Sequence, residues 1–97
     1  MQTNQAIVMK PVDNVATAVQ VLEPNKKVLV DLAGEKISIK VTELIPFGHK
    51  FAIKAIKKGE TIRKYGESIG AAIKNIKIGQ HVHVHNLEGC RGRGDKA

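Results

Sequence analysis

A ten-residue phrase that recurs along the chain constrains its fold more than any other feature. Residues 53–62 (Ile-Lys-Ala-Ile-Lys-Lys-Gly-Glu-Thr-Ile) match residues 73–82 (Ile-Lys-Asn-Ile-Lys-Ile-Gly-Gln-His-Val), and residues 19–28 form a looser copy. Each copy has aliphatic residues at its first, fourth and tenth positions and Gly or Asn at its seventh. Because Gly and Asn tolerate positive φ best, each copy predicts a tight turn that leads into a strand.

Other segments also predict short strands. Residues 6–9, 27–32 and 35–44 are candidates, and the pair Ala33-Gly34 predicts a hairpin between the last two. Because only 3% of the residues are aromatic, the core has to be built from aliphatic side chains. Short strands joined by Gly or Asn turns predict a mainly β domain with little helix.

The end of the chain differs in composition from the rest. Residues 88–97 are rich in Gly and Arg and carry almost no apolar side chain. Such a segment is expected to be a flexible tail until something binds it. The folded domain is therefore expected to occupy residues 1–87.

The net charge of the chain limits the classes of partner that it is expected to bind. Sixteen Lys and Arg against nine Asp and Glu give a net charge of +7, which favours an anionic ligand or an acidic protein surface. Nucleic acid is not expected, because the aromatic residues on which single-stranded bases stack are nearly absent. The sequence shows no apolar run near the roughly 20 residues of a membrane span and no secretory signal. A cytoplasmic protein without a membrane partner is expected.

The segment 81–86, His-Val-His-Val-His-Asn, concentrates side chains that can do chemistry. Its alternation predicts a half-buried strand, with Val82 and Val84 toward the core and three imidazoles on the opposite face. Neighbouring imidazoles can transfer protons near neutral pH, bind a metal, or hold an anion when protonated. A zinc site made from these three alone is disfavoured, because a catalytic site usually takes a ligand from elsewhere, and no second cluster has convincing spacing.

Four blocks of sequence stand in a specific order. They are Gly-His-Lys-Phe-Ala-Ile at 48–53, Lys-Gly-Glu at 58–60, Lys-Tyr-Gly-Glu-Ser-Ile-Gly at 64–70 and the histidine segment with its following leucine at 81–87. Their order and spacing resemble the SAF domain of the altronate and galactarate dehydratase family. That family also includes a two-subunit sulfolactate sulfo-lyase with a similar small subunit. The resemblance is strong over residues 47–87 and looser over residues 11–46.

The resemblance implies a β-clip fold and lyase chemistry on hydroxylated sugar acids. In fused members of the family, such a domain precedes a larger catalytic domain with a divalent metal, usually iron. The chain is therefore expected to be the small subunit of an altronate- or galactarate-type dehydratase. It would be inactive without a larger subunit, and the divalent metal would be held mainly by that subunit. A non-catalytic module that binds sugar acids and a sulfo-lyase small subunit are the alternatives.

This expected reaction assigns candidate roles. Dehydration removes a proton beside the carboxylate and expels the neighbouring hydroxyl, so it needs a base, an acid and positive charge. His83 and His85 are the candidate catalytic residues, with an ordinary solvated strand face as the alternative. The candidates for substrate binding are His49, Lys50, Lys64, Tyr65 and Asn86.

Four of the five substrate-binding candidates also have a structural alternative. His49 and Lys50 follow a Pro-Phe-Gly turn, where a loop can present them to a cleft or leave them in solvent. Tyr65, the only tyrosine, could instead pack against the small core. Asn86 could bind a substrate hydroxyl, orient a histidine, or cap the end of the strand. No metal ligand is assigned to this chain.

Overall fold

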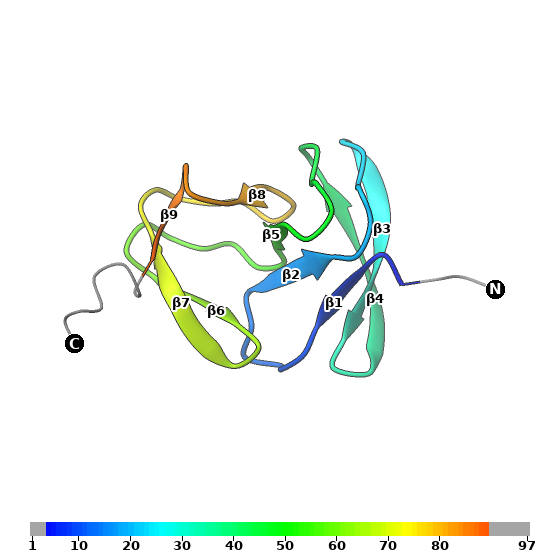
Figure 1. Cartoon of the computed structure of the whole chain (residues 1–97), viewed down its shortest axis with the longest axis horizontal. Coiled ribbons are helices and arrows are strands. Elements are labelled where there is room, and N and C mark those ends of the chain that lie inside the picture. The colour runs from blue at the N-terminus through cyan, green and yellow to red at the C-terminus, as the bar shows by residue number, and fades with distance from the viewer. Residues whose placement is uncertain (1–3, 90–97) are drawn as a thin grey trace.

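The computed structural model describes residues 4–89, which form strands and turns with no helix (Figure 1). No helix of this part of the chain is therefore available to cross a membrane. The strands form a six-stranded sheet in the order β4-β3-β1-β2-β5-β8 and a three-stranded sheet in the order β6-β7-β9. The mainly β architecture expected from the sequence is confirmed. The strands are β1 (Ala6–Val8), β2 (Val15–Ala18), β3 (Lys26–Leu32), β4 (Glu35–Val41), β5 (Lys50–Ala52), β6 (Thr61–Lys64), β7 (Glu67–Ala72), β8 (His81–Val82) and β9 (Leu87–Gly89).

The recurring phrase folds as a unit of bridge, turn and strand. A buried aliphatic residue makes a single backbone bridge, a residue with positive φ follows three positions later, and a buried strand residue comes three positions after that. This unit occurs four times in the described residues, at 22–28, 45–51, 56–62 and 76–82. The unit at 45–51 is not apparent from the sequence, where Pro-Phe-Gly looks like a break.

The turn of each unit has the geometry that the sequence predicts. The φ angles are 65° at Asn25, 83° at Gly48, 90° at Gly59 and 89° at Gly79. A positive φ at the third position of a four-residue turn is typical of a type II turn, in which Gly and Asn are favoured. The tight turns expected at Asn and Gly are confirmed.

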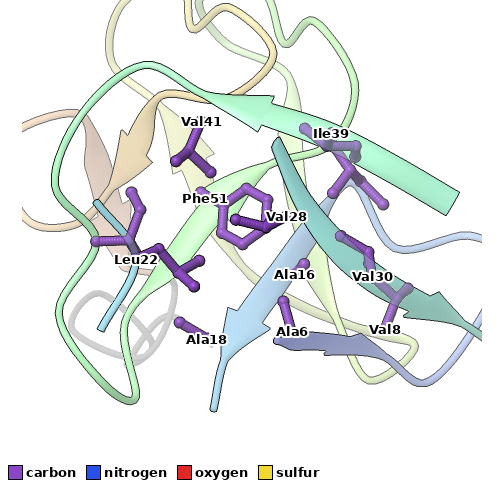
Figure 2. Close-up of a cluster of buried hydrophobic side chains, with 12 residues drawn as sticks. Ala6, Val8, Ala16, Ala18, Leu22, Val28, Val30, Ile39, Val41 and Phe51 are labelled. Atoms are coloured by element: carbon purple, nitrogen blue, oxygen red, sulfur yellow. The ribbon is translucent and has the colours of Figure 1, made fainter. Parts of the chain in front are cut away.

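The four units pair two by two. Leu22 bridges Ile45, and Ile56 bridges Ile76, so each pair brings two units together through their first residues. Each pair contributes to its own buried cluster, and Figure 2 shows the ring of Phe51 in the middle of the first. The first cluster contains Ala6, Val8, Ala16, Ala18, Leu22, Val28, Val30, Ile39, Val41, Ile45, Phe51 and Ile53. The second contains Val15, Ala52, Ile56, Ile62, Ala72, Ile76 and Val82.

Strands β2 and β5 contribute side chains to both clusters and lie near the middle of the view in Figure 1. In β5, Phe51 packs in the first cluster and Ala52 in the second. His81 pairs directly with Phe51, so their side chains share the face of the first cluster, whereas Val82 packs in the second cluster. The side chain of His81 is thereby directed to one face of the edge strand β8.

Both two-residue hairpins depend on positive φ. Leu32 pairs with Glu35 across Ala33-Gly34, whose φ angles are 49° and 99°, so the predicted hairpin is confirmed. This is the pattern of a type I′ turn, which matches the twist of the flanking strands. The carboxylate of Asp31 accepts the amide hydrogen of Gly34 at 2.9 Å and stabilises the turn.

The β6–β7 hairpin turns at Tyr65-Gly66, with φ angles of 56° and 80°. A non-glycine residue at positive φ is strained. The fully buried carboxylate of Asp13 offsets this strain, because it accepts the amide hydrogens of Tyr65 at 2.9 Å and Gly66 at 2.7 Å. Tyr65 is 44% exposed, so this residue lies at the hairpin tip and is not part of the buried core.

The strand predicted for the histidine segment is wrong beyond Val82. Val84 is 75% exposed and faces solvent, because the chain turns at this point instead of continuing the strand. The amide of Asn86 donates to the carbonyl of His83 at 3.0 Å, and the Asn86 side chain Oδ1 accepts the amide hydrogen of His83 at 2.9 Å. These local bonds satisfy backbone groups that a strand would use in a ladder.

Strand β9 follows this turn and pairs with β7. It carries the folded part of the chain to Gly89, two residues past the boundary expected at residue 87. The remainder of the predicted flexible tail, residues 90–97, lies outside the described residues.

Candidate functional site

All four histidines of the chain gather in one place, and we call them the histidine cluster: His49, His81, His83 and His85. The centroid of the His49 ring lies 4.4 Å from that of His83 and 5.1 Å from that of His81. These rings stack within 20° of parallel, and the ring of His85 is tilted at 5.4 Å from His81. The structure thus brings both predicted catalytic residues together with the predicted substrate-binding His49.

Two of the repeated turns show what the residue after the turn glycine normally does. The side chain of Glu60 accepts the amide hydrogen of Lys57 at 2.8 Å, and that of Gln80 accepts the amide hydrogen of Lys77 at 2.8 Å. In both units this side chain closes the turn on itself. It therefore satisfies a backbone amide of its own turn.

The side chain of His49 does not have to accept an amide hydrogen within its own turn, because a proline stands there. Pro46 occupies the place of Lys57 and Lys77 in the unit at 45–51, and proline has no amide hydrogen to satisfy. The side chain of His49 is therefore not needed in its own turn, and its Nδ1 lies 2.9 Å from Nε2 of His81. One substitution in a repeated turn explains why a histidine 32 residues away joins the cluster.

Asn86 and Glu43 hold the backbone on which the other rings stand. The buried Asn86 side chain donates from Nδ2 to the carbonyl of His81 at 2.8 Å and accepts from the amide of His83. Glu43 accepts the amide hydrogen of His81 at 3.0 Å. Both polar atoms of Asn86 are engaged with the backbone, so it takes the capping role that the sequence left open. Glu43 was not expected from the sequence, because nothing near it marks it as a neighbour of β8.

Burial and mutual repulsion keep part of the cluster neutral. The pKa of His81 lies below its ordinary value, mainly because burial disfavours the charged ring and secondarily because His49 lies beside it. The pKa of His83 is lowered for the same two reasons, with a further contribution from Lys50. Neutral imidazoles can accept a proton or donate a lone pair to a metal at neutral pH.

Positive charge lies beside the imidazoles. Lys50 is half-buried, and its pKa is lowered first by burial and then by the charge of Lys64. Since the charge of Lys50 also lowers the pKa of His83, Lys50 acts electrostatically on both the cluster and the β6–β7 hairpin. The Lys64 Nζ lies 4.9 Å from the centroid of the Tyr65 ring. An anionic ligand at the cluster would meet the ammonium group of Lys50.

Lowering the pH is expected to destabilise the fold through His81 and His83. In the unfolded chain both rings regain a pKa of about 6.5, so the unfolded state binds more protons than the folded state below that pH. The stabilising contribution is complete above about pH 6.5 and is lost as the pH falls through the lowered folded-state pKa values. Urea unfolding between about pH 7.5 and pH 5.5 measures this loss. A double variant, His81→Gln with His83→Gln, should flatten the profile, and an equally steep profile in that variant would contradict the assignment.

The ligand atoms of the cluster are close enough to share one ion. One nitrogen from each of His49, His81 and His83 lies within 4.8 Å of the other two, and so do the ligand atoms of Glu43, His81 and His85. Imidazole nitrogens suit divalent transition metals such as zinc, iron and copper. The residues present therefore fit such a metal, with His49 and Glu43 as the ligands from elsewhere that the sequence did not reveal.

The fold and the cluster define a small all-β domain that presents imidazole and lysine side chains at one edge. Residues 4–89 match the family described as the altronate/galactarate dehydratase SAF domain, and the chain belongs to this family. The resemblance inferred from the four sequence blocks is thereby confirmed.

Relatives of the chain include a dehydratase and the alpha subunits of a sulfo-lyase. The chain is 40% identical over 76 residues to altronate dehydratase of Bacillus subtilis (strain 168), a match that covers 78% of this chain and 14% of that enzyme. It is 52% identical over 44 residues to (2R)-sulfolactate sulfo-lyase subunit alpha of Paracoccus pantotrophus, covering 45% of this chain and 66% of that subunit. The corresponding subunit of Chromohalobacter salexigens is 42% identical over 52 residues, covering 54% of this chain and 55% of that subunit. The chain thus spans a small part of the dehydratase and between 55% and 66% of the length of the sulfo-lyase subunits.

Proposed function

We propose that this chain is the SAF-domain small subunit of an altronate- or galactarate-type dehydratase. Such an enzyme is a hydro-lyase that removes water from a hydroxylated sugar acid in the cytoplasm and yields a 2-keto acid. The observation that carries the proposal is the histidine cluster, which lies beside Lys50 in a domain of this family. The subunit is inactive, or nearly so, until a larger catalytic subunit completes the site.

The relatives support an arrangement with a larger partner. The match to altronate dehydratase covers 14% of that enzyme, so most of such an enzyme has no counterpart in the matched region. The sulfo-lyase relatives are named as alpha subunits, which supports a separate second chain. We assign the remaining catalytic groups to this larger subunit, together with most ligands of a divalent metal, for which we propose iron.

The cluster can supply the proton transfers of a dehydration. A neutral imidazole of His83 or His85 accepts the proton on the carbon beside the carboxylate, and the electron pair moves into the carboxylate. The bond from the next carbon to its hydroxyl then breaks, and the second imidazole, which enters the step in its protonated form, donates a proton so that water leaves. The resulting enol takes up a proton and becomes the 2-keto acid. When bound, the metal supplies positive charge next to the developing enediolate.

The lysines can hold the substrate while these protons move. A sugar acid carries at least one carboxylate, and Lys50 places an ammonium group beside the cluster, with the charge of Lys64 acting on Lys50 in turn. The half-buried position of Lys50 strengthens its attraction for an anion, because the surroundings screen the charge less than bulk water does. Tyr65 stands next to Lys64 and can add a hydroxyl contact.

The test is reconstitution with the neighbouring gene product. The chain and its co-expressed larger partner should co-purify in a fixed ratio and dehydrate altronate or galactarate. We expect His83→Gln and His85→Gln each to lower kcat by at least about 100-fold, the range for removal of a general acid or base. The control is Lys74→Gln on an exposed turn, which should keep full activity. Full activity in both histidine variants would refute their catalytic assignment.

A sulfo-lyase small subunit is the second candidate. The observation that favours it is the 52% identity to the sulfo-lyase alpha subunit of Paracoccus pantotrophus, which is higher than the 40% identity to altronate dehydratase. Sulfolactate also carries a carboxylate beside a hydroxylated carbon, so the same cluster could serve. Release of sulfite from sulfolactate by the reconstituted pair, without dehydration of altronate or galactarate, would select this function. Binding of a sugar acid without any partner or turnover would instead select a non-catalytic module.

A further inference from the structure

We propose that the chain itself binds one divalent transition-metal ion through His49, His81 and His83. This site lies within a single copy of the chain and needs neither the larger subunit nor a substrate. It therefore does not rest on the proposed function. The ligands come from the turn before β5, from β8 and from the turn after β8.

The spacing of the three rings fits coordination. Two nitrogens bound to one tetrahedral zinc ion, each at 2.0–2.1 Å from it, lie about 3.3 Å apart. The Nδ1 of His49 and the Nε2 of His81 are 2.9 Å apart, and all three ligand nitrogens lie within 4.8 Å of one another. The required spacing falls between these values. Because the lone pairs lie in the ring planes and these rings are stacked within 20° of parallel, the rings rotate out of the stack when they bind the ion.

The backbone holds all three ligands in place before an ion arrives. The amide of His49 donates to the carbonyl of Pro46 at 3.0 Å, and its carbonyl accepts from Ala18 at 2.9 Å. The backbones of His81 and His83 are both bonded to the side chain of Asn86. Ligands fixed in this way lose little freedom on binding, which raises affinity for the metal.

The chemistry of the ligands selects the class of ion. Three neutral nitrogen donors suit zinc, iron, cobalt, nickel or copper, whereas magnesium and calcium prefer oxygen. Three protein ligands also leave one position of a tetrahedral ion open to water or to an oxygen of a bound anion. The nearby Lys50 would assist such an anion at that open position.

The alternative group of Glu43, His81 and His85 is less suitable. Glu43 already accepts the amide hydrogen of His81 with Oε1, so part of its carboxylate is committed to the fold. His85 is exposed, whereas the three proposed ligands are half-buried. The group with three half-buried imidazoles is therefore the better site.

Metal binding would give His83 and His85 different roles within the cluster. With an ion bound, the coordinating nitrogen of His83 cannot accept a proton, and His85 remains as the free imidazole. Under the proposed function, His85 would then be the chain's own acid–base group, and the second proton-transfer group would come from the larger subunit. Loss of activity on substituting His83 would in that case reflect loss of the ion.

The test uses the purified chain without a polyhistidine tag. Cobalt(II) is titrated into the protein and followed by visible absorption, and zinc(II) binding is measured by calorimetry. We expect one ion per chain, with zinc displacing cobalt. His49→Gln and His83→Gln should each weaken binding by about 100-fold or more, because each removes a ligand. Far-UV circular dichroism and amide NMR spectra establish that each variant is folded.

Two further variants make the assignment specific. His85→Gln and Lys74→Gln should bind cobalt as tightly as the unchanged chain, since neither residue is a proposed ligand. The proposal is overturned if the unchanged chain binds neither ion more tightly than about 1 mM. It is also overturned if folded His49→Gln binds normally, or if His85→Gln abolishes binding. None of these outcomes decides whether the reconstituted enzyme dehydrates a sugar acid, so the two proposals fail independently.

Discussion

Replacing Gly79 by alanine is expected to destabilise the fold by roughly 2–5 kcal/mol. Gly79 has a φ of 89°, a conformation that costs an L-residue about 1–2 kcal/mol. A Cβ at this position would also lie 2.2 Å from the backbone carbonyl oxygen of Lys40. The chain must shift to relieve this overlap, at a cost of about 1–3 kcal/mol. The sum is a large share of the 5–15 kcal/mol by which domains of this kind are stable.

Gly59 provides a matched control for this substitution. It occupies the equivalent position in the unit at 56–62 and has nearly the same φ of 90°, but a Cβ there would have no atom within 4 Å. Gly59→Ala should therefore show the conformational cost alone, about 1–2 kcal/mol. Urea unfolding followed by far-UV circular dichroism measures both free energies. If the two variants lose the same free energy, the close approach to Lys40 is unimportant.

The same substitution should disturb the histidine cluster. The carbonyl of Gly79 accepts the amide hydrogen of Thr42 at 2.9 Å, which joins the turn before β8 to the segment that contains Glu43. His81 follows two residues after Gly79 and is bonded to Glu43. A shift at Gly79 is therefore expected to change the imidazole NMR signals, whereas Gly59→Ala should leave them in place.

Replacing Asp13 by alanine is expected to destabilise the fold by roughly 2–4 kcal/mol. Its buried carboxylate accepts the amide hydrogens of Lys10, Tyr65 and Gly66 at 2.7–3.2 Å. Loss of a bond to a charged acceptor costs about 1.5–3 kcal/mol, and water reaches the exposed turn to compensate in part. The backbone of Tyr65, which has a strained positive φ, also loses the carboxylate that accepts its amide hydrogen. The hairpin tip should separate from the segment that contains Asp13.

Asp31 is the control for this variant, because it has the same role in the β3–β4 hairpin. It accepts one turn amide, that of Gly34, in an exposed position, so Asp31→Ala should cost about 1 kcal/mol. Tyr65 is the only tyrosine and the chain has no tryptophan, so tyrosine fluorescence reports on the affected hairpin. Equal losses in the two variants, with unchanged fluorescence in Asp13→Ala, would contradict the anchoring role of Asp13.

The sequence predicts the turns of this fold better than its strand ends. Gly and Asn at positive φ have few alternatives, so the turns at Asn25, Gly59 and Gly79 and the hairpin after β3 follow from residue type. The end of β8 does not follow, because side chain–backbone bonds of Asn86 override the alternation of apolar and polar residues. Periodicity describes which faces are buried and contains no information on such local bonds.

The candidate site was partly predictable for a similar reason. The histidine segment is visible because its members are consecutive, and the resemblance to the SAF family adds His49 and Lys50 as candidates. The contact between His49 and His81 depends on the pairing of β5 with β8, which residue spacing alone does not specify. Glu43 enters through its bond to a backbone amide, and no feature of the sequence marks that bond. The catalytic roles of His83 and His85 remain predictions.

Pro46 suggests a route for engineering this scaffold. Proline has no amide hydrogen, so the turn at 45–51 does not need an acceptor side chain at residue 49. A proline introduced at Lys57 would remove the amide that Glu60 now satisfies, and residue 60 could then be varied freely. The residue after each turn glycine is thus a position at which a new functional side chain can be introduced, one turn at a time, while the two hydrophobic clusters stay unchanged.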